Sequence, residues 1–450
     1  MKKGSFMSFS RPLGIKKASS AYLKLISAVL VTMSISVQSA NAQKSSITLE
    51  NALKRTLSNN PDLVVFDFKS SALDGESKMA NLRPKMSVGV EVENVLGTGE
   101  VSGIKDADLT LTLSSVIELG DKVSGRMNVV STKKTQLLTQ RRIRTLDILG
   151  ETTRRYINVI VQQALHKTEQ RAEMLARTML QTVSTRVEAG ASSPLEKKRA
   201  ESALSQARLS LLISEQKLNE YKRDLAIMWG DTNAAFAEVE GTLLSFPNSL
   251  SLEHMLSQLQ SNPHVLLYAD NYRVQEARLR VVQASQQFDI AWEAGIRRMQ
   301  GINDTALVAS ISVPLNTKQR NLGEYEQQRA LLDSIDYQKQ AKIRELTRQL
   351  NQVISAKDQA LLTVTTLQDN VVPTLESALK LARDGYESGR YNYIEWVTTQ
   401  QQLIDMQRTL IKAAGLVHLR SADLEALTGI PVFSDSPSTS AQSSELLEKK

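Results

Sequence analysis

Two short segments of the sequence repeat the same polar pattern. In VEAGASSPLE, Glu196 follows Gly190 by six residues, and in YESGRYNYIE, Glu395 follows Gly389 by the same six residues. Both segments lie between long runs whose apolar residues have helical spacing. A glycine often ends a helix because it accepts positive φ, and a carboxylate in the first turn of the next helix is favoured by the helix dipole. The pattern predicts two tight turns whose carboxylates can attract cations or accept hydrogen bonds.

Other residue types that carry chemistry are sparse. The chain has no cysteine, which excludes disulfides, thiolate metal sites and cysteine nucleophiles. The glycine-rich segment 97–103 follows a predicted strand but has no Walker lysine and opens no helix, so it is predicted to be a hairpin loop. No nucleophile and base stand in a recognisable spacing. The four histidines are far apart in the sequence and form no H-x-x-x-H pair: His166, His254, His264 and His418. We therefore expect no catalytic residue, no cofactor and no resident metal.

The formal net charge of +7 does not indicate nucleic-acid binding. Segment 1–42 holds six basic residues and no acidic residue, so it accounts for almost all of this charge. Its basic start, the apolar run 25–37 and the A-x-A motif ending at Ala42 are typical of a secretory signal peptide. The apolar run has 13 residues, whereas a spanning helix needs about 20. We expect export with cleavage after Ala42.

An internal repeat organises the rest of the chain. Gly190 and Gly389 differ by 199 positions, and Gly230 and Gly429, which end the two halves, differ by the same 199. NNPDL near the start of the first half recurs as SNPHV in the second. Such order and spacing indicate an internal duplication. The predicted parts are a signal peptide (1–42), a first repeat (43–245), a second repeat (246–430) and a disordered tail (431–450).

Each half contains a segment in which apolar and polar residues alternate. Segments 85–116 and 287–314 predict two hairpins with one apolar and one polar face. The strands are about nine residues long, which suits a tilted strand that crosses a bilayer. Four strands cannot close a barrel in lipid, where open edges are not tolerated, but three chains would supply twelve. The lumen of that barrel would be polar and net acidic, lined by Ser87, Glu91, Glu93, Thr110, Thr112, Asp289, Glu293 and Ser310.

Long helices are predicted after each hairpin. Segments of about 126–188 and 322–386 have helical apolar spacing, and at 1.5 Å per residue roughly 60 residues reach roughly 90 Å. A return helix of about 35 residues follows each glycine turn. The expected fold is therefore mainly α with a small β part, in which long antiparallel helical hairpins extend a tube away from the membrane.

This order of elements, made twice over residues 43–430, resembles the TolC-like outer-membrane efflux factors. Within that family the chain is most similar to the heavy-metal, CzcC-like branch. IELGDKVSGR is similar to that branch's I-E-L-G-G-K-R segment, and SVPLNTKQRNLGE to its S-V-P-L-x-x-x-x-R-N-x-G. Asp121 stands where a second glycine is usual.

The resemblance implies a homotrimer with a 12-stranded β-barrel in the outer membrane and a trimeric α-barrel in the periplasm. Such a channel is the exit duct of a tripartite efflux pump. Its partners would be a periplasmic adaptor and an inner-membrane transporter of the proton-driven RND type, besides outer-membrane lipid. Heavy-metal cations or other small toxicants would be the cargo.

The resemblance also implies roles for the two turns. Gly190 and Gly389 would mark the periplasmic tips, where the adaptor docks. Glu196, Tyr386 and Arg390 would tether the inner hairpin closed, although Arg390 lies one residue earlier than in the family pattern. Glu395 would contribute to an acidic ring that faces the lumen. The alternative is that these residues are solvated charges near helix ends.

Three other functions remain open at this point. A periplasmic coiled-coil scaffold would bury the strands in a small soluble sheet and would dissolve without detergent. A type I secretion duct would share the channel architecture but pass proteins. An enzyme would need a catalytic constellation, which the sequence does not display.

Overall fold

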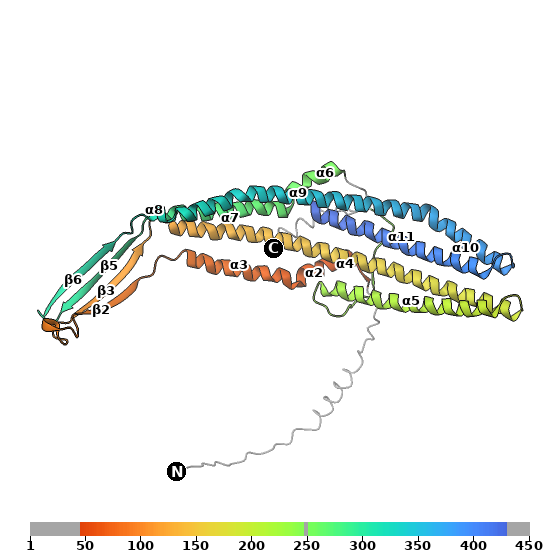
Figure 1. Ribbon diagram of the computed structural model, residues 1–450, viewed down its shortest axis with the longest axis horizontal. Helices are drawn as coiled ribbons and strands as arrows, with labels where there is room; N and C mark the ends of the chain where they lie inside the picture. The colour runs from red at the N-terminus through yellow and green to blue at the C-terminus, as the bar shows by residue number, and fades with distance from the viewer. Residues whose placement is uncertain (1–45, 247–250, 430–450) are drawn as a thin grey trace, which may run out of the picture. The chain divides into compact units, whose positions relative to one another are not determined.

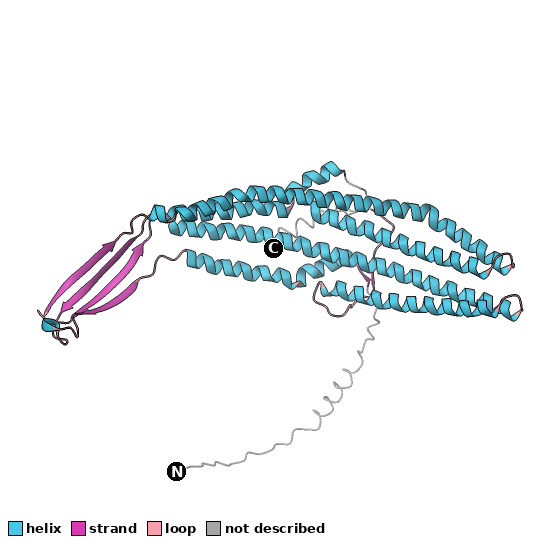
Figure 2. Cartoon of the chain, viewed as in Figure 1, coloured by secondary structure: helices cyan, strands magenta, loops and turns pink. Residues whose placement is uncertain are grey.

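The computed structural model describes residues 46–246 and 251–429, so the predicted signal peptide and C-terminal tail lie outside the described residues. Figure 2 shows long helices and one larger sheet, and the prediction of a mainly α chain with a small β part is confirmed. A second sheet is minimal: β1 (Ser46–Ile47) pairs in parallel with β4 (Glu238–Val239).

In each half, a helix near the start begins with the same asparagine cap followed by a proline. The helices that open the two halves are α2 (Leu49–Asn59) and α3 (Pro61–Ala80), then α6 (Leu252–Gln258), the 3-10 turn η2 (Leu259–Ser261) and α7 (Pro263–Ser285). Asn60 caps α3 and Asn262 caps α7, each followed by a proline in the first helical turn. The amide of Asn60 also donates to the carbonyl of Met228 at 2.9 Å, and that of Asn262 to the carbonyl of Leu427 at 2.8 Å. Each asparagine therefore ties the start of its half to the end of the same half.

The two predicted hairpins form one antiparallel sheet. Its strands are β2 (Ser87–Glu93), β3 (Asp108–Ile117), β5 (Ile290–Met299) and β6 (Asp304–Ser312), with the 3-10 turn η1 (Gly99–Val101) in the first loop. The strand order is β2-β3-β5-β6, so β3 and β5 join the hairpins of the two halves. Strands β2 and β6 are the edges and pair on one side only within the chain.

The sheet register separates an apolar face from a polar face. Val90, Leu111, Ile296 and Leu307 are aligned across all four strands and lie on one face. These side chains are exposed, from 52% for Ile296 to 86% for Leu307. In Figure 1, no helix of the described part lies over this sheet. A contiguous exposed apolar face of this kind marks a surface that contacts lipid or another protein.

The long helices of the two halves differ in continuity. Helix α4 (Lys122–Glu188) is unbroken over 67 residues, and α5 (Pro194–Ile227) returns beside it. In the second half, the short α8 (Thr317–Arg320) precedes α9 (Leu322–Thr366), the π-helical turn η3 (Leu367–Val371), α10 (Val372–Glu387) and α11 (Tyr393–Thr428). The long helix predicted over 322–386 is present, and one π-helical turn interrupts its α-helical hydrogen-bond pattern. Pro373 has no N–H to donate within a helix, and the wider π turn accommodates it.

The helices lie side by side in Figure 1, with α4 in contact with α3, α5, α7 and α11. Apolar core residues gather in clusters along these contacts instead of in one centre. The sheet is connected at one end of the helices, and the two glycine turns lie at the other end. The fold thus separates the two predicted sites, the turns and the sheet.

The junction between sheet and helices explains the departure at Asp121. Asp121 has φ 55° and ψ 30°, and Asn316 takes the same left-handed conformation before α8. Only glycine adopts this conformation without cost, and asparagine and aspartate tolerate it better than other residues. The side chain of Asp121 makes no capping hydrogen bond. Glycine in the related segment and aspartate here therefore satisfy the same backbone requirement.

We expect Asp121→Gly to retain or raise stability, whereas Asp121→Val lowers it by about 1–2 kcal/mol, because a β-branched side chain resists positive φ. The measurement is the thermal midpoint of the detergent-solubilised protein. A lower midpoint for Asp121→Gly would show that the aspartate side chain, not the backbone conformation, matters at this position.

Candidate functional site

The two turns at the far end of the helices have the same backbone. Gly190 and Gly389 have φ of 70° and 75°. Past each glycine, a backbone N–H reaches back to close the helix: Ala191 donates to the carbonyl of Arg186, and Arg390 to that of Gly385, both at 2.8 Å. This is the Schellman arrangement, which needs a residue at positive φ. The glycine positions follow directly from local backbone geometry.

The two glutamates that follow these glycines have different partners. Both occupy the third position of a helix, after the N-caps Ser193 and Asn392. Glu395 closes a capping box, because its carboxylate accepts the backbone N–H of Asn392 at 2.9 Å. Glu196 instead accepts the hydroxyl of Tyr386 at 2.9 Å. The two glutamates occupy equivalent positions but have different roles: Glu395 caps its own helix, and Glu196 links the two hairpins.

Tyr386 is at the centre of the contacts between the two glycine turns, which together are called the tip. Its side chain is 3% exposed, and its ring packs against Trp396 with centroids 5.3 Å apart. Its hydroxyl is also 2.9 Å from the hydroxyl of Ser192. Burial raises the pKa of Tyr386, so the hydroxyl stays protonated at neutral pH and can donate to Glu196. The α4–α5 and α10–α11 hairpins are thus joined by one buried phenol.

Arg186 takes the basic position at the tip that was predicted for Arg390. The Arg186 guanidinium lies 5.0 Å from the ring centroid of Tyr386 and donates to the carbonyl of Glu387 at 2.6 Å. Arg390 is exposed, and its Nε donates to the hydroxyl of Ser388 at 3.1 Å. Within the described residues of one chain, the Arg390 side chain therefore contacts its own turn. The only sequence signal for Arg186 was its place in the last turn of a helix, where bases are common.

A series of ion pairs joins the hairpins above the tip. Arg408 of α11 contacts both carboxylate oxygens of the buried Glu169 of α4 at 2.7 Å each. The hydrogen bonds that Arg408 donates to the Glu169 carboxylate raise the pKa of Arg408. Arg171 contacts Glu376 at 3.1 Å in a more exposed pair of the same kind. These contacts hold the two halves together along the helices.

The sheet places most of the predicted lumen residues together. Glu91 pairs with Thr110, and Thr112 pairs with Gly295, so these residues share the polar face with Glu93 and Glu293. Asp289 lies one residue before the start of β5. The carboxylate of Asp289 accepts from the Lys122 ammonium at 2.6 Å and the backbone N–H of Leu119 at 3.2 Å, at the junction of sheet and helix.

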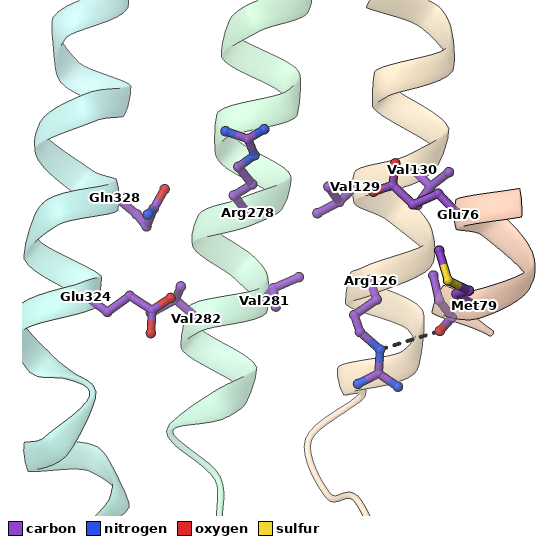
Figure 3. A pocket seen from close by; sticks show the side chains of 11 residues that line it. Glu76, Met79, Arg126, Val129, Val130, Arg278, Val281, Val282, Glu324 and Gln328 are labelled. Carbon is purple, nitrogen blue, oxygen red and sulfur yellow. Dashed lines mark hydrogen bonds between the residues drawn. The ribbon is translucent and has the colours of Figure 1, made fainter. Parts of the chain in front are cut away.

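A pocket of about 460 Å³ lies on the helices next to the sheet, across α3, α4, α7 and α9 (Figure 3). Valines line it together with the charged residues Glu76, Arg126, Arg278 and Glu324. Glu76 pairs with Lys133, and Arg126 is held by Glu118 at 2.6 Å. No three His, Asp or Glu side chains of the described residues are grouped so that they could hold a metal ion.

None of the described helices combines the length and apolar character needed to span a membrane.

Comparisons with known proteins agree with this architecture. Residues 52–231 match the family described as outer membrane efflux protein. The chain is 26% identical to the cobalt-zinc-cadmium resistance protein CzcC of Cupriavidus metallidurans over 369 residues, which is 82% of this chain and 84% of that protein.

Solved structures show the same fold. CusC superposes with a TM-score of 0.70 at 13% identity, covering 84% of this chain and 91% of CusC. The outer membrane protein VceC of Vibrio cholerae superposes with a TM-score of 0.66 at 16% identity, covering 84% of this chain and 96% of VceC. The matches are with channels and efflux proteins, which fits the expectation of a non-enzymatic protein. The chain is therefore similar to outer membrane efflux proteins in sequence over residues 52–231, and it shares its fold with solved outer-membrane channels over most of its length.

Proposed function

We propose that three copies of this chain form one outer-membrane efflux channel. The observation that carries the proposal is the four-stranded sheet, whose apolar face is exposed and whose edges β2 and β6 are unpaired within the chain. In lipid every backbone polar group needs a partner, so the sheet must close with further strands. Three copies supply twelve strands, and the apolar face then contacts lipid while the polar face surrounds the lumen.

The helices continue this tube into the periplasm as a trimeric α-barrel. The chain would work as the exit duct of a tripartite pump, with a periplasmic adaptor at the tips and an inner-membrane transporter, of the RND type, that supplies the energy. Heavy-metal cations or other small toxicants are the proposed cargo, since the relative CzcC is named for resistance to cobalt, zinc and cadmium.

The tip residues form the proposed gate. The phenol of Tyr386 and the carboxylate of Glu196 join the two hairpins of each chain, and Arg186 supports the phenol from its ring face. Separating the hairpins requires this contact to break. Three copies of Glu395 would add negative charge at the same end, where an acidic ring favours cations. Gly190 and Gly389 would mark the surface where the adaptor docks.

The two halves would descend from one duplicated unit, bounded near residues 43–245 and 246–430. The paired asparagines support this, because Asn60 and Asn262 have the same cap and reach the end of their own half in the same way. A chance similarity of sequence would not reproduce these tertiary contacts.

A pair of adjacent substitutions tests the barrel. Val90→Arg places a guanidinium on the apolar face and is expected to abolish trimer assembly in the outer membrane, at a cost of about 2–4 kcal/mol per chain near the bilayer midplane. Glu91→Arg, the next residue on the same strand, faces the proposed lumen and should assemble normally. The measurement is the amount of heat-modifiable trimer extracted by detergent from outer membranes.

Equal assembly of the two variants, or release of the wild-type protein without detergent, would contradict the barrel and favour a soluble scaffold. The cargo is tested by deleting the gene and exposing the cells to metal salts, dyes and antibiotics. Sensitivity to antibiotics alone would contradict heavy-metal export, and a loss of protein secretion without any sensitivity would indicate a type I secretion duct.

A further inference from the structure

The polar face of the sheet carries one positive charge among several negative ones. Among its strand residues in β2, β3, β5 and β6, Arg297 is the only base, and the acids are Glu91, Glu93, Asp108, Glu293 and Asp304.

Arg297 is held at two points. Its Nε donates to the hydroxyl of Thr110 at 3.0 Å, and its Nη2 lies 2.8 Å from the carboxylate of Glu93. The side chain thus extends from β5 across β3 to β2 and covers Thr110, which is 1% exposed. A planar guanidinium bound in this way stays against the wall of the sheet instead of extending into solvent. The positive charge is therefore fixed next to one particular acid.

This pair lies at the end of the sheet that is remote from the helices. Glu93 is the last residue of β2, and Arg297 is two residues before the end of β5, where loops connect the strands. We infer that Arg297 sets the charge selectivity of the outer mouth of the channel by neutralising Glu93 there. The inference rests on the proposed function, because it requires the polar face to surround the lumen.

The physical consequence is a local one. With Arg297 in place, the other acids keep the mouth negative, but the positive charge of Arg297 cancels the negative potential of Glu93. Without Arg297, a carboxylate is released and a positive charge is removed, so cations concentrate and anions are repelled more strongly. Screening confines the effect to about 10 Å at 0.1 M salt and to about 3 Å at 1 M.

A chemical probe measures this field directly, because the chain contains no cysteine. Ala306→Cys places one thiol opposite Arg297 on the neighbouring strand β6. Intact cells are labelled from outside with a cationic and an anionic methanethiosulfonate, both membrane-impermeant. The ratio of the two labelling rates reports the potential at the thiol and does not depend on the state of the periplasmic tips.

In low salt, Arg297→Gln is expected to raise the cation-to-anion rate ratio several-fold. Glu93→Gln should lower it, and the double variant should return it towards the parent value. All the ratios should converge in 1 M salt. Arg298→Gln is the matched control, since Arg298 lies on the opposite face and contacts Asn303 and Thr305.

If Arg297→Gln leaves the ratio of labelling rates unchanged, the inference is overturned. Arg297→Lys retains the positive charge, so its ratio should match that of the parent; it is the second variant to compare where Arg297→Gln assembles poorly. Arg297→Gln and Arg297→Lys giving the same ratio would also contradict the inference. If neither reagent labels the parent thiol, the polar face does not line a water-filled lumen, and the proposed function itself fails. The two failures are therefore distinguishable.

Discussion

Tyr386→Phe and Glu196→Gln are each expected to raise the single-channel conductance in planar bilayers. The phenol and the carboxylate are 2.9 Å apart and join the two hairpins at the tip. A hydrogen bond to a charged acceptor contributes about 1.5–3 kcal/mol, and three chains would lose it together. Phenylalanine preserves the packing against Trp396 and Arg186, so the variant removes the link without emptying the core.

The control for the tip is Arg390→Ser. Because Arg390 contacts Ser388 within its own turn, its loss should leave the conductance close to that of the wild type, whereas Arg186→Ser should raise it. The opposite result, a raised conductance for Arg390→Ser and an unchanged one for Arg186→Ser, would show that Arg390 stabilises the closed gate in the assembled trimer. An unchanged conductance in Tyr386→Phe and Glu196→Gln would remove both residues from the gate.

Arg408→Met is expected to destabilise the helical part by about 3 kcal/mol, because it leaves the carboxylate of Glu169 buried without its partner. The estimate takes the lower end of the range for buried pairs, since the Arg408 side chain is 32% exposed. The double variant with Glu169→Leu removes both charges and should recover most of the loss. Thermal unfolding of the detergent-solubilised protein measures the effect.

Arg171→Met is the matched comparison for this pair. Arg171 and Glu376 also join α4 to the second half, but their side chains are 48% and 45% exposed. Exposed pairs contribute about 0–1 kcal/mol, so this variant should unfold close to the wild type. Equal effects of Arg408→Met and Arg171→Met would contradict the special role of the buried pair.

Much of the fold could be predicted because its signals are local. The alternation of Val88, Val90 and Val92 with polar residues defines a strand face without knowledge of its partner, and the structure places these valines together. The N-P steps within NNPDL and SNPHV are likewise local signals, since Asn60 and Asn262 cap the helices that begin at the following prolines. Periodicity and capping operate over a few residues, so a single sequence reveals them.

The details that sequence spacing did not predict depend on groups that are close in space but distant in the sequence, or on the local requirements of one residue. The helix expected over 322–386 forms, but Pro373 removes a donor and the helix contains a π turn that periodicity does not indicate. Alternation predicted that Asp289 lines the lumen but did not indicate its partner, the Lys122 ammonium, which lies 2.6 Å from it across 167 residues of sequence. Neither the space around a proline nor the position of a distant cation can be read from spacing.

The repeated glycine turn shows the same division most clearly. The positive φ at Gly190 and Gly389, and a glutamate in the first turn of each following helix, are local requirements that the sequence alone reveals. The packing of the two hairpins decides which glutamate caps its own helix and which accepts the hydroxyl of Tyr386. The same packing decides that Arg186, instead of Arg390, contacts the ring of Tyr386. Hydrogen bonds between hairpins are selected by distance and burial, which only the tertiary structure decides.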